Sequence, residues 1–167
     1  MLVVLSLTTL SLQACTPEDT AKGESAPPLT NGDSGGCGGI NPVVKNLVTS
    51  DGGPVTDSDH GGQQPSIKVE WDMEDEDHDL NTFAYSVWYE TASDGSADTT
   101  AKAKASGVQE LKDGACTSGS AHYSLRFGVN GGAMQYTTAY DFTVIITDMA
   151  DLDSEPMSAT GTTPGPL

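Results

Sequence analysis

Two short acidic stretches hold the side chains of this chain with the clearest capacity for chemistry. Residues 72–79 carry six carboxylates and residues 148–155 carry four. In proteins Ca²⁺ is bound by roughly six to eight oxygen atoms, many of them from carboxylates. The candidate ligands are Asp72, Asp75, Asp77, Asp79, Asp148, Asp151 and Asp153. We therefore expect a weak Ca²⁺ site here, with a solvated acidic surface that holds no ion as the alternative.

The nucleophilic side chains do not form a credible catalytic set. Residues 32–36, Gly-Asp-Ser-Gly-Gly, match the segment around the nucleophilic serine of trypsin-like proteases. Those enzymes place the catalytic His and Asp before the Ser in sequence. In this chain the first His is His60, which follows Ser34, and the His residues lack the spacing of a zinc site. We therefore expect a protein without enzymatic activity and without catalytic residues.

The charge balance limits the partners of the protein. The chain has 24 Asp and Glu residues against 7 Lys and Arg residues, and its net charge is -17. Affinity for nucleic acid comes largely from Lys and Arg side chains that neutralise phosphates. The sequence therefore argues against nucleic acid as a partner and favours cations, Ca²⁺ above all.

The first residues predict export and a lipid anchor. Residues 1–14 contain no charged side chain, and they fall short of the roughly 20 apolar residues that span a bilayer. They fit the apolar region of a signal peptide. Residues 12–15, Leu-Gln-Ala-Cys, resemble the lipobox of bacterial lipoproteins. The resemblance implies cleavage before Cys15 and lipidation of its thiol. Because Thr16 rather than Asp follows, it also implies the outer membrane or the cell surface. No Lys or Arg precedes the apolar run, although signal peptides normally begin with positive charge. The alternative to a lipoprotein is a plain secretory signal with a chance Cys at position 15.

Composition divides the rest of the chain into a tether and a domain. Residues 15–41 are rich in Gly, Ser, Pro and Thr, with few apolar residues, and we expect a disordered tether there. Residues 42–163 are expected to form the domain, because apolar and polar residues alternate in it with the period of a β-strand. Clear alternation occurs over residues 67–71, 83–89, 123–129 and 140–146, and weaker alternation over 43–48 and 157–162. We place a further edge strand at residues 99–105, and the interval 107–113 could make one helical turn.

Three of these segments resemble strands of fibronectin type III domains. Residues 65–71, Pro-Ser-Ile-Lys-Val-Glu-Trp, look like strand B with its core Trp. Residues 85–89, Tyr-Ser-Val-Trp-Tyr, look like strand C. Residues 140–144 look like strand F, in which Tyr140 would be the corner tyrosine whose hydroxyl bonds back to the chain. The resemblance implies an all-β fold, a seven-stranded antiparallel immunoglobulin-like sandwich. Domains of this family serve as binding modules or as spacers, and the resemblance implies no catalysis.

Counting strands up and down the sandwich brings two cysteines to one end of it. Cys37 precedes the first strand and Cys116 precedes the strand near residue 123, so both fall at the end that also carries the two acidic stretches. An even pair of cysteines in an exported protein favours a disulfide, and we expect a Cys37–Cys116 bridge. Two free thiols or an intermolecular bond are the alternatives.

The predicted function is that of a non-enzymatic surface lipoprotein. Its β-sandwich would serve as a binding or spacer module, with Ca²⁺ stabilising one end. The alternative is a carbohydrate-binding accessory module, because the parity of Trp88 places its ring on the outer face of a strand, where an aromatic residue can stack on a sugar. The expected partners are a membrane, through the lipid anchor, and a protein or polysaccharide.

Overall fold

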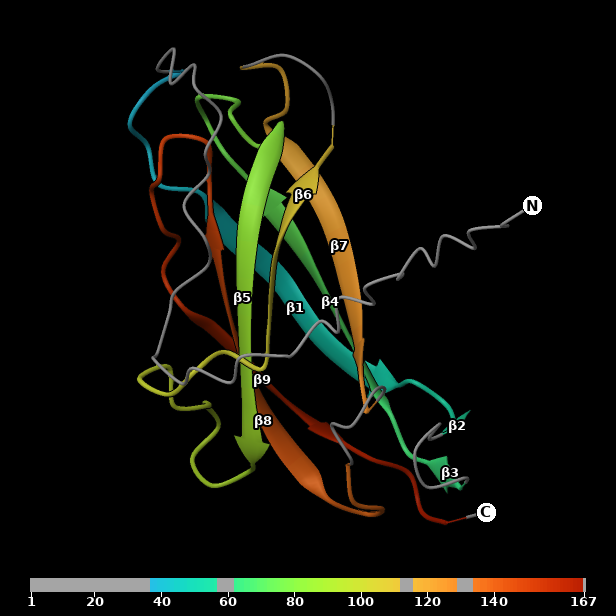
Figure 1. Ribbon diagram of the computed structural model, residues 1–167. Coiled ribbons are helices and arrows are strands. Elements are labelled where there is room, and N and C mark those ends of the chain that lie inside the picture. Colours follow the sequence, from blue (N-terminus) through green and yellow to red (C-terminus); the bar gives the residue numbers. More distant parts are fainter. Residues whose placement is uncertain (1–36, 57–61, 112–115, 129–133, 167) are drawn as a thin grey trace, which may run out of the picture.

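The computed structural model describes residues 37–56, 62–111, 116–128 and 134–166 (Figure 1). The expected signal peptide, the lipidation site Cys15 and the expected tether up to residue 36 lie outside the described residues. Within the described part there is no helix long and apolar enough to cross a membrane.

Two larger antiparallel sheets make up most of the fold, and they are layered in Figure 1. One sheet has the order β1-β4-β7, with β1 at Val43–Asp51, β4 at Ile67–Glu74 and β7 at Ser120–Phe127. The other has the order β6-β5-β8-β9, with β6 at Ala105–Glu110, β5 at Thr82–Thr91, β8 at Ala139–Thr147 and β9 at Met157–Thr162. The expectation of an all-β, antiparallel fold is confirmed.

The strand count differs from the seven that we expected. Nine strands occur in the described part of the chain, because β2 at Val55–Thr56 and β3 at Gln63–Gln64 form an additional pair of two residues each. We expected the edge strand over residues 99–105, but β6 begins only at Ala105. It continues to Glu110 and so occupies most of the interval 107–113, for which we suggested a helical turn. Residues 97–104 instead cover the outer face of β5, as the contacts of Trp88 described below show.

The period-two pattern corresponds to burial between the sheets. Along β4 the side chains of Ile67, Val69, Trp71 and Met73 are fully buried, whereas the intervening side chains are partly exposed. Burying one large apolar side chain stabilises a fold by about 1.5–3 kcal/mol. The central strands β5 and β8 are buried on both faces over most of their length, which shows that further chain covers the outer face of that sheet.

Aromatic rings join the two sheets across this core. The rings of Phe83 on β5 and Tyr123 on β7 are 5.6 Å apart between centroids and meet edge to face. The rings of Phe127 on β7 and Phe142 on β8 are 5.4 Å apart. Both separations lie in the range in which aromatic pairs attract each other. The core therefore lies between the two sheets.

Two predicted cross-links are present. The hydroxyl of Tyr140 accepts a hydrogen bond of 2.8 Å from the backbone N–H of Gln135, so it bonds back to the preceding chain. A disulfide joins Cys37 to Cys116, with 5.2 Å between their Cα atoms, and it connects positions 79 residues apart. On the chain-entropy estimate, closing a loop of this length stabilises a fold by up to about 4.5 kcal/mol. The disulfide therefore ties the chain before β1 to the segment before β7.

Candidate metal centre

Three aspartates from two loops meet inside the protein. Asp75 and Asp79 follow strand β4, and Asp148 follows strand β8, which belongs to the other sheet. One carboxylate oxygen of each lies within 4.8 Å of the others. Asp79 and Asp148 are completely buried and Asp75 is 5% exposed. The cluster therefore joins the ends of the two sheets, and three like charges share one buried volume.

Several oxygens of this cluster have no hydrogen-bond partner among the described residues. They are Asp75 Oδ2, both oxygens of Asp79, Asp148 Oδ2 and, beside them, Asp77 Oδ1. The carboxyl groups of Asp75 and Asp79 face each other, but two carboxylates can bond only when one of them holds a proton. Nearly all buried polar atoms in native proteins have a partner. The unpartnered oxygens therefore make this cluster a candidate cation site.

Backbone N–H groups hold the carboxylates in a consistent way. Asp148 Oδ1 accepts hydrogen bonds from the N–H groups of Ala150 (2.8 Å) and Leu152 (2.9 Å). Asp75 Oδ1 accepts one of 3.1 Å from the N–H of Asp77. In each case one oxygen orients the side chain and the other remains unpartnered. Together with the two oxygens of Asp79, the three clustered aspartates present four unpartnered oxygens.

Burial and mutual repulsion change the acidity of these groups. Burial raises the pKa of Asp79 to about 8, with further increases from the carboxyl groups of Asp75 and Asp148. Burial also raises the pKa of Asp148 to about 6, although the N–H groups of Leu152 and Ala150 oppose the rise. The pKa of Asp75 is raised as well, mainly by burial. Without a cation, the cluster therefore retains a proton at neutral pH.

The loop that carries Asp75 and Asp79 rests on the segment before β7. The N–H of Asp75 donates to Gly119 O (2.9 Å), and the N–H of Leu80 donates to Ser118 O (3.0 Å). The buried side chain of Asn81 accepts hydrogen bonds from the N–H groups of Thr117 and Ser118. Asn81 is not predicted from the sequence, where its only signal is a polar residue between the apolar Leu80 and strand β5. We refer to residues 75–79, 116–119 and 148–153 together as the acidic pole.

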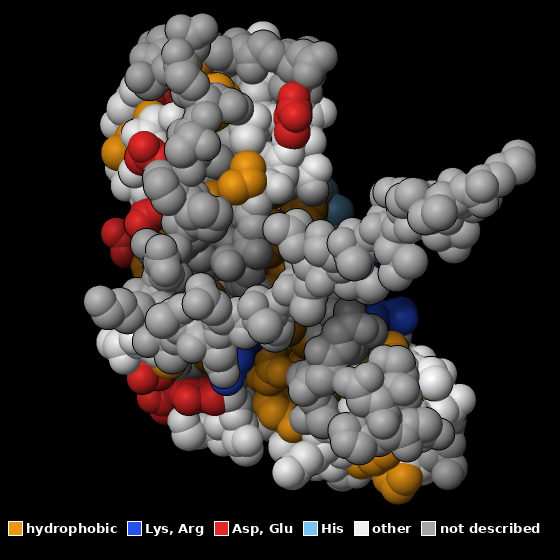
Figure 2. All heavy atoms as spheres, viewed as in Figure 1, with side chains coloured by type: hydrophobic (Ala, Val, Ile, Leu, Met, Phe, Trp, Pro, Cys, Tyr) orange, Lys and Arg blue, Asp and Glu red, His pale blue; other side chains and the backbone are white. Residues whose placement is uncertain are grey.

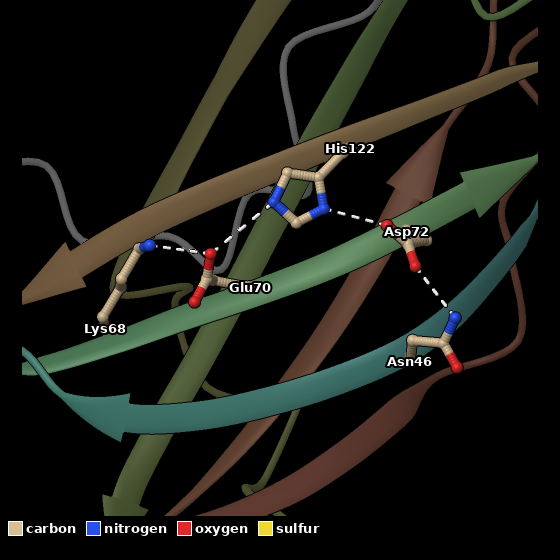
Figure 3. A network of polar contacts seen from close by, with 5 residues as sticks. All are labelled: Asn46, Lys68, Glu70, Asp72 and His122. Carbon is tan, nitrogen blue, oxygen red and sulfur yellow. Dashed lines mark hydrogen bonds and ion pairs between the residues drawn. The ribbon is translucent and has the colours of Figure 1, made fainter.

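Asp72 does not belong to the cluster. It lies on the outer face of the sheet β1-β4-β7, where its Oδ1 is 2.8 Å from His122 Nδ1 and its Oδ2 accepts a hydrogen bond from Asn46 Nδ2 (Figure 3). The hydrogen bond from Asn46, followed by that from His122, lowers the pKa of Asp72. Figure 3 shows the same His122 reaching Glu70, which also pairs with Lys68. The expectation that Asp72 is a ligand was wrong, because Asp72 precedes the end of β4 and alternates with the buried Trp71 and Met73.

Asp151 and Asp153 were also expected as ligands and lie outside the cluster. Both residues are exposed. Asp151 has a left-handed backbone conformation, with φ of 60°. Asp153 Oδ1 accepts a hydrogen bond of 2.7 Å from the hydroxyl of Thr147. Of the second acidic stretch, only Asp148 therefore turns inward, because the N–H groups that follow it fold back onto its side chain.

Trp88 lies on the outer face of β5 but is not available for stacking on a sugar. Its side chain is 7% exposed, and its indole Nε1–H donates a hydrogen bond of 2.8 Å to Ala101 O. The expectation of an accessible ring was wrong, because the segment that contains Ala97 and Ala101 covers it. The cover itself is anchored on β8, where the N–H of Ala97 donates to the hydroxyl of Thr143.

The surface agrees with the charge balance of the sequence. Figure 2 shows acidic side chains at several separate places on one face of the molecule, and basic side chains at fewer. Such a surface attracts cations and repels polyanions. No family model, curated protein or solved structure matches the chain. The candidate metal centre therefore rests on its own geometry.

Proposed function

We propose that this protein is an exported, lipid-anchored β-sandwich module without enzymatic activity, and that a Ca²⁺ ion bound at the acidic pole stabilises it. The observation that carries the proposal is the set of four buried, unpartnered oxygens on Asp75, Asp79 and Asp148. Leaving these oxygens charged and without a partner would cost several kcal/mol. A divalent cation supplies the missing charge and the missing partner together.

The chemistry of the donors favours Ca²⁺ over other metals. Every donor of the cluster is a carboxylate oxygen, and no His or Cys belongs to the group found among the described residues. Oxygen donors suit the hard cations, whereas Zn²⁺ is commonly bound by Cys and His. Mg²⁺ retains several waters and demands near-octahedral geometry, which a buried pair of loops accommodates less readily than the variable shell of Ca²⁺. Extracellular modules bind Ca²⁺ at about 10⁻⁴–10⁻³ M, and we expect an affinity in that range.

The lipobox-like residues 12–15 support export and anchoring at the outer membrane or the cell surface. The Cys37–Cys116 disulfide supports the same conclusion, because disulfides persist in oxidising compartments. A module that stands outside the cell would also meet the Ca²⁺ concentrations that a weak site needs.

The resemblance to fibronectin type III domains supports a binding or spacer role. The strand orders β1-β4-β7 and β6-β5-β8-β9 resemble those of that family, and the hydroxyl of Tyr140 makes the bond expected of its corner tyrosine. On this proposal β2 and β3 are an insertion into the family's pattern. Carbohydrate binding is the weaker candidate, because Trp88, on which it depended, is covered.

Thermal unfolding in the presence of different salts tests the Ca²⁺ site. At ten times its dissociation constant, Ca²⁺ should stabilise the protein by about 1.4 kcal/mol, which raises the melting temperature of a domain of this size by about 3–6 °C. NaCl at matched ionic strength screens diffuse repulsion and serves as the control. If Ca²⁺ raises the melting temperature no more than NaCl does, the acidic pole holds no specific site and the proposal fails.

Two variants locate the site. Asp79→Asn removes the carboxylate of which both oxygens lack a partner among the described residues, and it should abolish the effect of Ca²⁺ on the melting temperature. Asp151→Asn makes the same change of charge at an exposed position of the same pole, and Asn tolerates its left-handed conformation. The Asp151→Asn variant should therefore keep the full response. An equal loss in both variants would indicate general electrostatics and would contradict the site.

A further inference from the structure

Residues 37–41, which we call the strap, lie between the disulfide and the first strand. We propose that Asp77 is shared between the strap and the Ca²⁺ site, so that the bound ion fixes the strap, and with it the connection to the N-terminal anchor, onto the domain. This inference rests on the proposed function, because it requires Ca²⁺ at the acidic pole. It assigns to Asp77 a role that differs from those of Asp75, Asp79 and Asp148.

One oxygen of Asp77 holds the strap. Asp77 Oδ2 accepts a hydrogen bond of 3.0 Å from the backbone N–H of Ile40. The backbone of Gly38 passes so close that a Cβ built on it would lie 2.1 Å from this oxygen. Gly38 also has a φ of 154°, which residues with a side chain rarely adopt. The strap is therefore shaped around the Asp77 carboxylate.

The other oxygen of Asp77 has no partner in the part of the chain that the structure describes, and Asp77 contacts one member of the cluster, although it is not among the three aspartates whose oxygens lie within 4.8 Å of one another. Asp77 Oδ1 is buried and has no hydrogen-bond partner among the described residues, although the residue as a whole is half-buried. Its carboxyl group lies within hydrogen-bonding reach of that of Asp75, one of the clustered aspartates. A carboxylate can ligate a cation through one oxygen while the other accepts a hydrogen bond. On this proposal Asp77 does both.

The remaining ties of the strap also lead to the acidic pole. Cys37 is bonded to Cys116, and Asn41 Nδ2 donates a hydrogen bond of 2.7 Å to Asp153 O. The strap pairs with no strand in the described part of the chain. Segments held by few bonds open locally at small free energies, so a single additional constraint has a measurable effect. Without an ion, repulsion among the neighbouring carboxylates loosens the loop of Asp77; with an ion, the loop and the strap become ordered together.

Hydrogen exchange at the amide of Ile40 tests the coupling. The measurement uses the full chain with its disulfide intact, in EDTA and in Ca²⁺ at ten times its dissociation constant. In the unmodified protein we expect Ca²⁺ to slow exchange at Ile40 by about tenfold, in parallel with the rise in melting temperature. Exchange near the start of β8, at the end of the strand opposite Asp148, provides the internal reference for global stabilisation.

Asp77→Asn separates the coupling from the binding of the ion. An amide has one oxygen and one NH₂ group, so it cannot place one oxygen toward the N–H of Ile40 and a second oxygen toward the ion, as the carboxylate does. Asp75, Asp79 and Asp148 remain, so Ca²⁺ should still raise the melting temperature of this variant. Exchange at Ile40, however, should no longer respond to Ca²⁺. Asp151→Asn serves as the matched control and should behave as the unmodified protein does.

Each outcome decides the inference. If Ca²⁺ raises the melting temperature but leaves exchange at Ile40 unchanged in the unmodified protein, the proposed function stands and the coupling is wrong. If Asp77→Asn retains the slowing of exchange by Ca²⁺, the ion orders the strap by another route and the assignment of Asp77 is wrong. If Ca²⁺ has no effect beyond that of NaCl on the melting temperature, both proposals fail.

Discussion

The two ends of strand β8 each carry a buried aspartate, and their surroundings are opposite. Near the start of the strand, Asp141 Oδ2 accepts hydrogen bonds of 2.9 Å from the N–H groups of Ser93 and Gly95. Its Oδ1 accepts a hydrogen bond of 2.5 Å from the hydroxyl of Thr160. These donors, the Thr160 hydroxyl first, lower the pKa of Asp141. After the end of the same strand, Asp148 faces Asp75 and Asp79 and keeps one oxygen without a partner.

The difference shows two ways of burying a negative charge. Asp141 is completely buried, yet the protein supplies donors to both of its oxygens, and the carboxylate ties the segment after β5 to the sheet. Asp79 is equally buried, and the described residues supply no donor to either of its oxygens. Burial alone therefore does not indicate a site. The candidate site is distinguished by buried carboxylate oxygens that also lack donors within the described part of the chain.

The largest expected effect on stability is at Asp141, where both carboxylate oxygens have donors. Asp141→Ala leaves the N–H groups of Ser93 and Gly95 and the hydroxyl of Thr160 without their acceptor. An unsatisfied buried donor costs about 1–3 kcal/mol, so we expect the free energy of unfolding to fall by about 3–5 kcal/mol. Urea denaturation in the presence and absence of Ca²⁺ measures this free energy. A loss of less than about 1 kcal/mol would show that Asp141 is not the structural counterpart of the acidic pole.

Loss of a carboxylate at the acidic pole should change the free energy of unfolding in the opposite direction. In EDTA at pH 9, above the pKa of about 8 of Asp79, the substitution Asp79→Asn removes a charge that has no donor and that repels two neighbours within 4.8 Å. We expect the variant to be more stable than the unmodified protein by about 1–2 kcal/mol. Urea denaturation in EDTA measures the difference, and Asp151→Asn again serves as the control. If Asp79→Asn destabilises the ion-free protein as strongly as Asp141→Ala does, Asp79 has structural partners and the comparison fails.

The pH dependence of stability should distinguish the two ends without any substitution. The raised pKa values of Asp79, about 8, and Asp148, about 6, exceed the ordinary pKa of 3.8 of an aspartate in an unfolded chain. Their stabilising contribution is therefore complete below about pH 4 and is lost as the pH rises toward 8. The lowered pKa of Asp141 acts in the opposite sense, and its contribution is lost only as the pH falls below the unfolded value.

In EDTA, we thus expect the melting temperature to fall by several degrees between pH 5 and pH 8. Saturating Ca²⁺ should flatten this slope, because the ion takes the place of the retained proton. Differential scanning calorimetry at unit pH intervals provides the measurement. A melting temperature in EDTA that is flat from pH 5 to pH 8 would contradict the raised pKa of Asp79.

The smallest effect is expected on the outer face of the sheet β1-β4-β7. His122 contacts Asp72 and Glu70 there, but its side chain is 60% exposed. Exposed ion pairs contribute little, because water screens them. His122→Ala should change the melting temperature by less than about 2 °C and leave the Ca²⁺ response intact. A loss of that response would place Asp72 in the metal centre after all.

The sequence by itself determined the positions of the main strands. Alternation predicted strands over residues 67–71, 83–89 and 140–146, and β4, β5 and β8 contain these ranges. The prediction succeeded because a strand with one face in the core requires apolar residues at every second position. The bond of Tyr140 and the Cys37–Cys116 bridge were also predictable, since each depends on which residue stands at a given place in the strand order.

Only the tertiary structure decided which carboxylates meet. In the first acidic stretch the composition is nearly uniform, and alternation ceases to apply after Glu74, where β4 ends. Whether an aspartate there turns inward depends on support from distant residues, such as Gly119 and Asn81. The same holds for Trp88, which a segment later in the chain covers. Local sequence patterns predict strands from their period of two. The hydrogen-bond donors around a single side chain, and the segments that cover it, come from distant parts of the chain that only folding brings together.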